Sequence, residues 1–293
     1  MSKELKKGPL YLLYGVLMGI GEIIPGVGAQ TAAILLGIYE RLVVLMYSYT
    51  EFLKSLLFFV IKKVPFTQVK KDFFGINWTL SAAIGIGTPV GFLLLSGLLT
   101  RLLDRYPEYV FSAAMGIILA TITIPWKEIE KKRIQEYAII IITTIVFFIL
   151  FGIEGHSLAN SVSPITMFMA GIVCSVAGFF PGVSMSFALL LMGLYQYIIN
   201  LAHRFSTFSF TSTDILNIVS FSAGTSIGGI VLIRTMKKIL DQYKSYLLSF
   251  IIGLMLASLR TVWPFIDRMS ASNPEDMIKI SPFAYAPLHM TTI

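Results

Sequence analysis

The chain has 293 residues, of which 56% are hydrophobic and 13% are charged, and its mean hydropathy is +0.79. Soluble domains carry about a quarter charged residues, so this composition excludes an ordinary water-soluble enzyme or nucleic-acid-binding module and indicates a membrane protein. The net charge of +7 is interpreted as loop charge that faces the cytoplasmic surface of a membrane.

The first apolar region, 9–47, is interrupted near its middle by Pro25-Gly26. A transmembrane helix needs roughly 20 apolar residues, and each piece beside this break is short for a crossing. Such a pattern is typical of a broken helix or a re-entrant hairpin. Irregular backbone at membrane depth is tolerated only where protein buries it or water reaches it. We therefore predict that the break lines a cavity.

The next segment, 50–74, mixes phenylalanine and leucine with five lysines. This combination predicts an amphipathic element that lies on the membrane surface. A solvated connector with a few apolar contacts fits the same pattern equally well. The five lysines are Lys54, Lys62, Lys63, Lys70 and Lys71.

Five later segments have the length and apolar character of membrane-spanning helices, although the last of them is slightly short. They are 77–99, 109–125, 135–153, 215–235 and 246–263. Between the third and the fourth, residues 161–200 repeat the interrupted pattern, with the break at Pro181-Gly182. Residues 265–293 are polar enough to be a tail.

The two interrupted regions are copies of one another. Residues 25–39 read PGVGAQTAAILLGIY and residues 181–195 read PGVSMSFALLLMGLY, an ungapped match at an offset of 156. A second set of matches follows at an offset of 137, because the first half has the longer connector. Two collinear matches indicate an internal duplication. The second set pairs Gly87 with Gly224, Gly91 with Gly228, Asp104 with Asp241, Tyr106 with Tyr243, Tyr109 with Tyr246, Gly116 with Gly253, and Trp126 with Trp263.

The duplication predicts the membrane topology. Each repeat holds one Pro-Gly-broken hairpin and two spans, so each returns the chain to its starting side. The unpaired span at 135–153 then turns the second repeat upside down, which is the inverted-repeat plan of many transporters. The expected fold is an all-α polytopic membrane protein. Its parts are a first repeat (1–134), a linking transmembrane helix (135–160), a second, inverted repeat (161–264) and a C-terminal tail (265–293).

The distribution of positive charge agrees with this topology. With the N-terminus inside, 17 of the 23 Lys and Arg residues fall in the predicted cytoplasmic segments. This bias follows the positive-inside rule and predicts a multi-pass protein of the cell membrane with its C-terminus outside. The outer side keeps Arg101, Arg105, Arg204, Arg260, Arg268 and Lys279.

A new half-helix is expected to begin after each break. The N-terminus of a helix carries free N–H groups and a partial positive charge, which suit a phosphate or carboxylate. Inverted hairpins would point both of these ends at the membrane centre. The alternative is that the Pro-Gly elements only kink and cap packed helices. The predicted substrate-binding residues at the breaks are Pro25, Gly26, Gly28, Gln30, Thr31, Pro181, Gly182, Ser184 and Ser186.

Three charged residues extend this predicted site. Glu22 lies deep in the first apolar region, and intramembrane carboxylates are usually functional, so we expect it to couple transport to an ion. The alternative is a protonated Glu22 that bonds to free backbone at the break. Arg41 and Arg234 are included as candidate phosphate contacts, although the favoured interpretation is that Arg41 caps helix carbonyls and that both side chains snorkel to the interface.

The sequence predicts neither a catalytic site, nor a metal site, nor a bound cofactor. There is one cysteine, Cys174, and the three histidines, His156, His203 and His289, lie far apart. No nucleophile-elbow, Walker A or dinucleotide-binding motif is present.

The two break motifs give the chain a family resemblance. PGVGAQTAAILLGIYER (25–41) and PGVSMSFALLLMGLY (181–195) resemble the paired motifs of the PopT family of polyprenyl-phosphate transporters, PG-S-G-G-T with GIYE-R and PG-S-G-S with GxY. The resemblance runs from about residue 8 to Trp263. This chain departs from the family pattern in both loops, since Gly28-Ala29-Gln30 replaces Ser-Gly-Gly and Met185 replaces Gly, whereas Thr31, Ser184 and Ser186 are kept.

The resemblance implies a translocase that returns polyprenyl monophosphate, of undecaprenyl or dolichyl type, from the outer to the cytoplasmic leaflet for envelope glycan or glycoprotein synthesis. Its partners would be the lipid, the membrane and a coupling proton or sodium ion, with no nucleic acid. Two alternatives remain, namely a small-anion transporter or channel on the same scaffold and an enzyme that acts on lipid phosphates. The sequence does not fix the carrier, the coupling ion or the oligomeric state.

Overall fold

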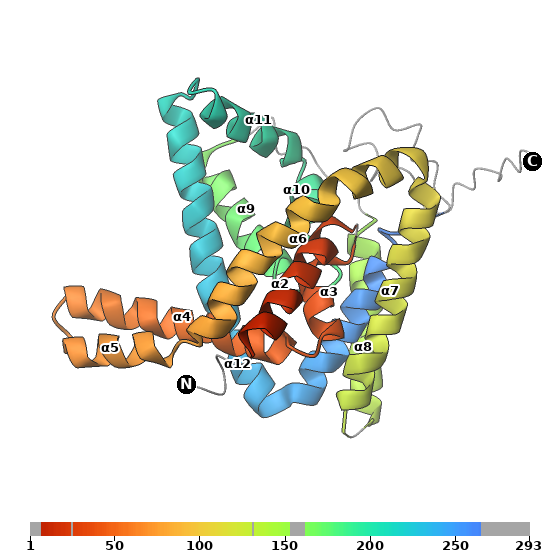
Figure 1. Ribbon diagram of the computed structural model, residues 1–293, viewed down its shortest axis with the longest axis horizontal. Coiled ribbons are helices and arrows are strands. Elements are labelled where there is room, and N and C mark those ends of the chain that lie inside the picture. Colours follow the sequence, from red (N-terminus) through yellow and green to blue (C-terminus); the bar gives the residue numbers. More distant parts are fainter. Residues whose placement is uncertain (1–6, 25, 131, 153–161, 265–293) are drawn as a thin grey trace, which may run out of the picture.

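The computed structural model of the protein describes residues 7–24, 26–130, 132–152 and 162–264, and these form eleven helices without any strand (Figure 1). Four helices are long and apolar enough to cross a membrane, and three more are apolar but shorter. The protein is therefore an all-helical, multi-pass membrane protein. The long helices are α4 (Tyr39–Val60), α6 (Trp78–Arg105), α7 (Pro107–Glu128) and α12 (Ser212–Ser258), and the shorter ones are α2 (Gly8–Ile23), α8 (Ile134–Leu150) and α9 (Pro164–Ala177).

The first interrupted region forms two helices that turn back on each other. α2 ends where Ile24 adopts an extended conformation, and the eight-residue α3 (Gly28–Leu35) begins four residues later. Gly26 and Gly28 have positive φ angles of 73° and 67°, a conformation in which glycine avoids the steric cost of a side chain. The break therefore lies where the sequence predicted it.

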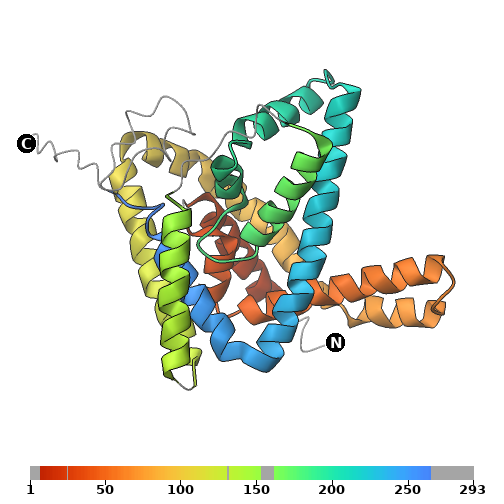
Figure 2. The ribbon, with the colours of Figure 1, turned by 180° about the vertical axis from the view of Figure 1, so that it is seen from behind.

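α4 and α5 (Phe66–Gly75) form a hairpin that projects sideways from the rest of the molecule (Figures 1 and 2). The turn between them contains Lys62 at a positive φ of 56°, and Pro65 precedes the first residue of α5. The segment predicted as one element, 50–74, is thus divided between the second half of α4 and most of α5. Its position at a membrane surface stays a prediction.

The next three helices correspond to the predicted spans, with shifted ends. Asn77 caps α6 by accepting a hydrogen bond from the Leu80 amide, and α6 passes into α7 at Tyr106. α8 ends at Leu150, so the linking helix predicted over 135–160 is shorter than expected in its described part, and residues 153–160 lie outside the described residues.

The second interrupted region has the same local design as the first. α9 ends at Ala177, and α10 (Met185–Leu191) begins after a turn that contains Pro181 and Gly182, the latter with a φ of +85°. The turn before α11 (Tyr195–Ser206) contains Gly193 with a φ of 65°, matching Gly37 before α4, whose φ is 66°.

The spans predicted at 215–235 and 246–263 are parts of one continuous helix. α12 runs through both of them and is bent at Tyr243, whose φ and ψ of −137° and 43° are non-helical. Tyr106, its partner in the predicted repeat, has nearly the same angles, −141° and 53°, at the junction between α6 and α7. We call Ser212–Gln242 and Lys244–Ser258 the first and second arms of α12.

Glycines at corresponding positions bring corresponding helices together. α2 packs closely on α6, and α9 packs closely on the first arm of α12. A side chain at Gly87 would meet the Leu12 carbonyl, and one at Gly224 would meet the Phe168 carbonyl, two residues that are again 156 positions apart. From the sequence, glycines in membrane-spanning segments favour close packing between helices, and this expectation applies to both positions.

The same expectation of close packing applies to Gly91, Gly228, Gly85 and Gly229. A side chain at Gly91 or Gly228 would collide with α2 or α9, as expected. The prediction is wrong for Gly85, which has open space around it, and Gly229 meets only an ordinary contact at 3.8 Å from Phe179. Gly85 lies two residues before Gly87, on a different side of α6.

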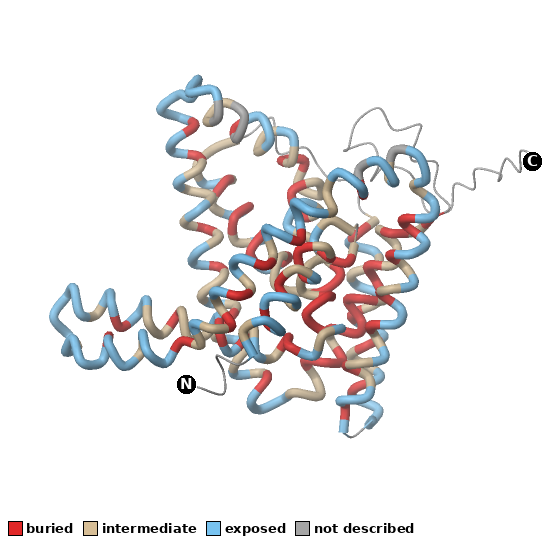
Figure 3. Tube along the Cα trace, viewed as in Figure 1, coloured by how far each residue is buried: buried red, intermediate tan, exposed pale blue. Residues whose placement is uncertain are grey.

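The buried core lies where the two halves meet, around α3, the start of α4, α7 and the second arm of α12 (Figure 3). Fully buried side chains there include Ile38, Ile118, Ile251 and Met255. By contrast, α8 exposes a row of large apolar side chains from Ile141 to Leu150. An apolar exterior of this kind suits contact with lipid, where a soluble protein would carry charge.

Candidate functional site

The first break is held together by Glu22. Its Oε2 accepts a hydrogen bond of 2.8 Å from the backbone N–H of Ala29, one of the free donors in the first turn of α3. The carboxyl group therefore occupies part of the N-terminus that was expected to receive an anion. This contact corresponds to the alternative in which Glu22 bonds to free backbone, and its role in ion coupling stays a prediction.

The second break is capped by a serine. The Ser184 side chain accepts a hydrogen bond of 3.1 Å from the Phe187 amide, and Ser186, two residues further along, is exposed. Pro181 and Gly182 are buried, and a side chain at Gly182 would lie 2.6 Å from Oγ of Ser258. This turn therefore packs directly on the end of the second arm of α12.

The two breaks lie close to one another in the folded protein. The Gln30 side chain donates a hydrogen bond to the Gly178 carbonyl at the end of α9, and the Tyr39 hydroxyl donates one of 3.3 Å to the Phe179 carbonyl. Gly26 faces Val262, which follows α12, just as Gly182 faces Ser258. The residues predicted at the breaks are thus gathered at one place, except that Pro25 lies outside the described residues.

Thr31 is the most unusual polar residue of this region. It is completely buried in α3, and its hydroxyl has no hydrogen-bond partner among the described residues. A buried hydroxyl without a partner is unfavourable, and such groups in native proteins call for an explanation. A role in contacting a ligand or a water molecule is one such explanation.

The two arginines lie away from the breaks and have different surroundings. Arg41 is exposed at the start of α4, where its guanidinium group lies 3.3 Å from the Tyr11 hydroxyl. Arg234 forms an ion pair of 3.3 Å with Glu51 and reaches the Thr50 carbonyl, so it connects α12 to α4. The structure therefore gives Arg234 a structural contact that the sequence did not predict.

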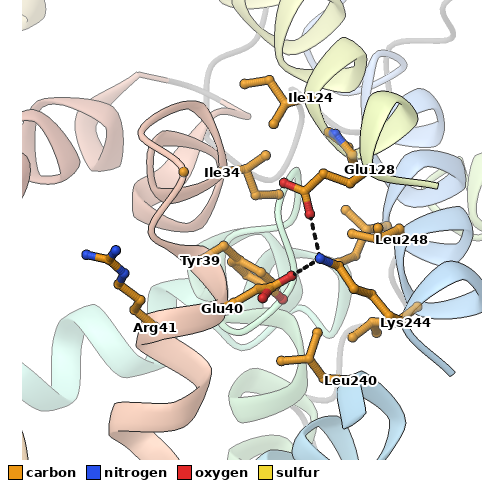
Figure 4. A pocket seen from close by; sticks show the side chains of 13 residues that line it. Ile34, Tyr39, Glu40, Arg41, Ile124, Glu128, Leu240, Lys244 and Leu248 are labelled. Carbon is orange, nitrogen blue, oxygen red and sulfur yellow. Dashed lines mark ion pairs between the residues drawn. The ribbon is translucent and has the colours of Figure 1, made fainter. Parts of the chain in front are cut away.

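A cavity of about 350 Å³ lies beyond the end of α3, between α4, α7 and the second arm of α12 (Figure 4). Lys244 projects into it between two carboxylates, with its Nζ 2.5 Å from Oε1 of Glu40 and 3.0 Å from Oε2 of Glu128. Sequence reasoning missed this group because its members are far apart in the chain. The one sequence signal for this group was the GIYER motif, which contains Glu40.

A second cavity, of about 540 Å³, adjoins the first and shares Glu40, Arg41, Leu240 and Lys244 with it. Its other charged residues are Lys7, Lys237 and Asp241, so cations outnumber anions in its lining. Arg41 points away from Lys244 in Figure 4, and it lines both cavities. Both cavities lie at the end of the molecule that was predicted to be cytoplasmic.

Comparison with known proteins assigns the family. Residues 18–278 match the model of the VCA0040-like family, described as undecaprenyl phosphate translocase-like. The chain belongs to this family. The match includes both break motifs and all the residues that line the first cavity, so the translocase-like family resemblance predicted from the motifs is confirmed.

A relative of this translocase-like chain is found in Vibrio cholerae serotype O1 and carries the name polyprenyl-phosphate transporter. The two sequences are 26% identical over 258 residues, which cover 88% of this chain and 78% of the relative. No solved structure matches the chain.

Proposed function

We propose that this protein carries a polyprenyl monophosphate, of undecaprenyl or dolichyl type, from the outer to the cytoplasmic leaflet of the cell membrane, and so returns a carrier lipid for glycan or glycoprotein synthesis. The observation that carries the proposal is the family match over residues 18–278. The apolar helices and the printed name of the relative agree with it.

The proposed mechanism uses two inverted repeats. In Figure 1 the chain rises through α2 and α6, and it descends through α9 and the first arm of α12. The matching contacts of Gly87 and Gly224 and the matching backbone angles of Tyr106 and Tyr243 support the register of the duplication. Substrate sites in transporters of this plan lie at the interface between repeats.

The phosphate group is proposed to bind between the two breaks. A phosphate cannot cross hydrocarbon cheaply, so a polar environment at mid-membrane would lower the barrier. Gln30 and Thr31 would contribute polar side chains from the first repeat, and Ser184 and Ser186 from the second. The contact between Gln30 and Gly178 supports this arrangement because it joins the two breaks directly.

Glu22 is proposed to couple this binding to protons. Its carboxylate and a phosphate would compete for the same N–H groups at the start of α3, and two negative charges in one site repel each other. Protonation of Glu22 would remove that repulsion and release the Ala29 N–H. A pH gradient across the membrane could thereby drive exchange between the carboxyl group and the lipid phosphate.

The test is reconstitution of the full-length protein into liposomes that contain a defined polyprenyl phosphate. We expect the protein to move this lipid between leaflets, and an imposed pH gradient to change the rate. Uptake of soluble anions without lipid movement would instead favour a small-anion transporter. Release of inorganic phosphate from the lipid would favour an enzyme.

A further inference from the structure

The charged group Lys244, Glu40 and Glu128 contributes little to the fold by its ion pairs alone. The three side chains are 42%, 45% and 43% exposed, and ion pairs that reach solvent add little stability. They nevertheless come from three helices and meet at the edge of a cavity (Figure 4). An ammonium group held at a cavity by two flexible carboxylates is a site that an incoming anion can enter by exchange.

The cavity combines apolar and charged groups. Seven of its thirteen lining residues are apolar and four are charged, with Lys244 between the two carboxylates (Figure 4). An amphiphile with an anionic head would satisfy both kinds of group at once, and the volume of about 350 Å³ is within the range of small-molecule sites. The apolar lining residues are Ile34, Ile124, Pro125, Leu240, Leu247, Leu248 and Ile251.

We propose that this cavity is a second binding site for a phosphate monoester, distinct from the site at the two breaks. Lys244 binds the phosphate, and the apolar lining residues hold the first isoprenoid units of the lipid. Arg41, which lines both this cavity and the adjoining one, adds a second positive charge. This inference rests on the proposed function, because it assumes that the transported lipid carries a phosphate.

The position of the cavity fits a site on the path of the lipid. α3 has eight residues, which makes it about 12 Å long, and it joins the first break to the cavity. Its beginning contacts the second break through Gln30, and its end supplies Ile34 to the cavity wall. A lipid phosphate that leaves the breaks toward the predicted cytoplasmic side therefore meets Lys244 next.

The two carboxylates act as competitors of the ligand in this proposal. Without ligand, Glu40 and Glu128 neutralise Lys244, and when a phosphate binds they turn toward water, which their exposure permits. Removal of their charge should therefore strengthen binding. If the group were only structural, the same change would not improve binding.

Native mass spectrometry of the full-length protein can count bound ligands. The probes are farnesyl phosphate, farnesol and inorganic phosphate. We expect two farnesyl phosphates on the unchanged protein and one on Lys244→Met, whose second dissociation constant should rise at least about tenfold with the loss of a charge-assisted hydrogen bond. Lys244→Arg, which keeps the charge, should bind two. The double variant Glu40→Gln/Glu128→Gln should bind the second ligand about tenfold more tightly.

Arg204→Met is the matched control, because it breaks an ion pair of 2.7 Å with Asp214 that lies outside both cavities, and it should still bind two ligands. Unchanged binding to Lys244→Met, or weaker binding to the double variant, would overturn the inference. Displacement of the second ligand by equimolar inorganic phosphate would support the phosphate site and overturn the role of the apolar wall. If the unchanged protein moves lipid but binds one farnesyl phosphate, the second site is refuted and the proposed function stands. If the protein neither moves lipid nor binds a second farnesyl phosphate, the proposed function is refuted as well.

Discussion

Thr31 combines complete burial with a hydroxyl that has no hydrogen-bond partner in the described part of the chain, which is unfavourable for folding. Thr31→Val keeps the shape of the side chain and removes the hydroxyl, so we expect the protein to gain about 1 kcal/mol of stability. If the hydroxyl contacts the lipid phosphate, the same variant should move lipid several-fold more slowly. Thermal unfolding in detergent and leaflet exchange in liposomes measure the two effects. A variant that is more stable and equally active would show that Thr31 has no part in transport.

Glu22 is the second residue whose contact predicts a measurable effect. Glu22→Gln keeps an oxygen that can accept the Ala29 hydrogen bond but removes the charge at the start of α3, which should cost about 0.3–1 kcal/mol. If Glu22 carries the coupling proton, the rate at which the variant moves lipid between leaflets should no longer change when a pH gradient is imposed across the membrane. The control is Glu51→Gln, which weakens the ion pair with Arg234 outside the breaks and should keep the pH response. A normal pH response in Glu22→Gln would contradict proton coupling.

The residues of the breaks could be predicted from the sequence, whereas the charged group at the cavity could not. Proline restricts φ and glycine readily adopts the positive φ angles of a turn, so the start of α3 at Gly28 follows from a few adjacent residues. The meeting of Lys244 with Glu40 depends on how α4 packs against α12, and no local pattern encodes a contact between residues 204 positions apart (244 − 40). The same limitation hid the ion pair of Arg234 with Glu51.

The two pairs of packed helices, α2 with α6 and α9 with α12, should respond alike to substitution. An alanine side chain at Gly87 would lie 2.6 Å from the Leu12 carbonyl, and one at Gly224 would collide with the Phe168 carbonyl. We expect either alanine variant to lose about 1–3 kcal/mol of stability. Gly85→Ala on the same helix has open space and should be neutral or stabilising by up to about 1 kcal/mol. Equal melting temperatures for Gly85→Ala and Gly87→Ala would contradict this packing.

The hairpin of α4 and α5 is expected to lie along the membrane surface. Phe66 and Phe74 are 61% and 69% exposed and would enter the lipid, while neighbouring lysines would meet anionic head groups. A fluorophore attached to Phe74→Cys in a Cys174→Ala background should be quenched by lipids brominated close to the head group. A label at Lys63→Cys, in the turn, should be quenched less. Equal and weak quenching at both positions would favour a solvated hairpin.

At the element scale, the sequence predicted which segments are helical more accurately than where they end. Runs of apolar residues mark α6, α7 and α8, because the membrane requires them. The bend in α12 was not predicted, since the charged stretch around Lys237 and Asp241 resembles a loop although it stays helical. An ion pair between these two residues, one turn apart, helps the helix to continue through that stretch.

The topology of the whole molecule depends on one helix. α4 is long and apolar enough to cross a membrane, yet it extends sideways with α5, while α7 and α8 run along the bundle (Figure 1). If α4 lies along the membrane surface, the two repeats have opposite orientations. The N-terminus and the C-terminus then lie on opposite sides of the membrane. If α4 crosses the membrane, the number of membrane crossings changes by one. The seventeen Lys and Arg residues of the predicted cytoplasmic segments then no longer lie on one side of the membrane.

Cysteine labelling of intact cells decides between these arrangements. In a Cys174→Ala background, Lys63→Cys lies in the turn between α4 and α5, and Phe208→Cys replaces an 87% exposed residue just before α12. With a surface hairpin, a membrane-impermeant maleimide added outside should label residue 208 and not residue 63, because the inverted second repeat places the start of α12 outside. Permeabilised cells provide the control in which both positions react. Labelling of residue 63 from outside would mean that α4 spans the membrane, and the convergence of two inverted breaks on one phosphate would then have to be abandoned.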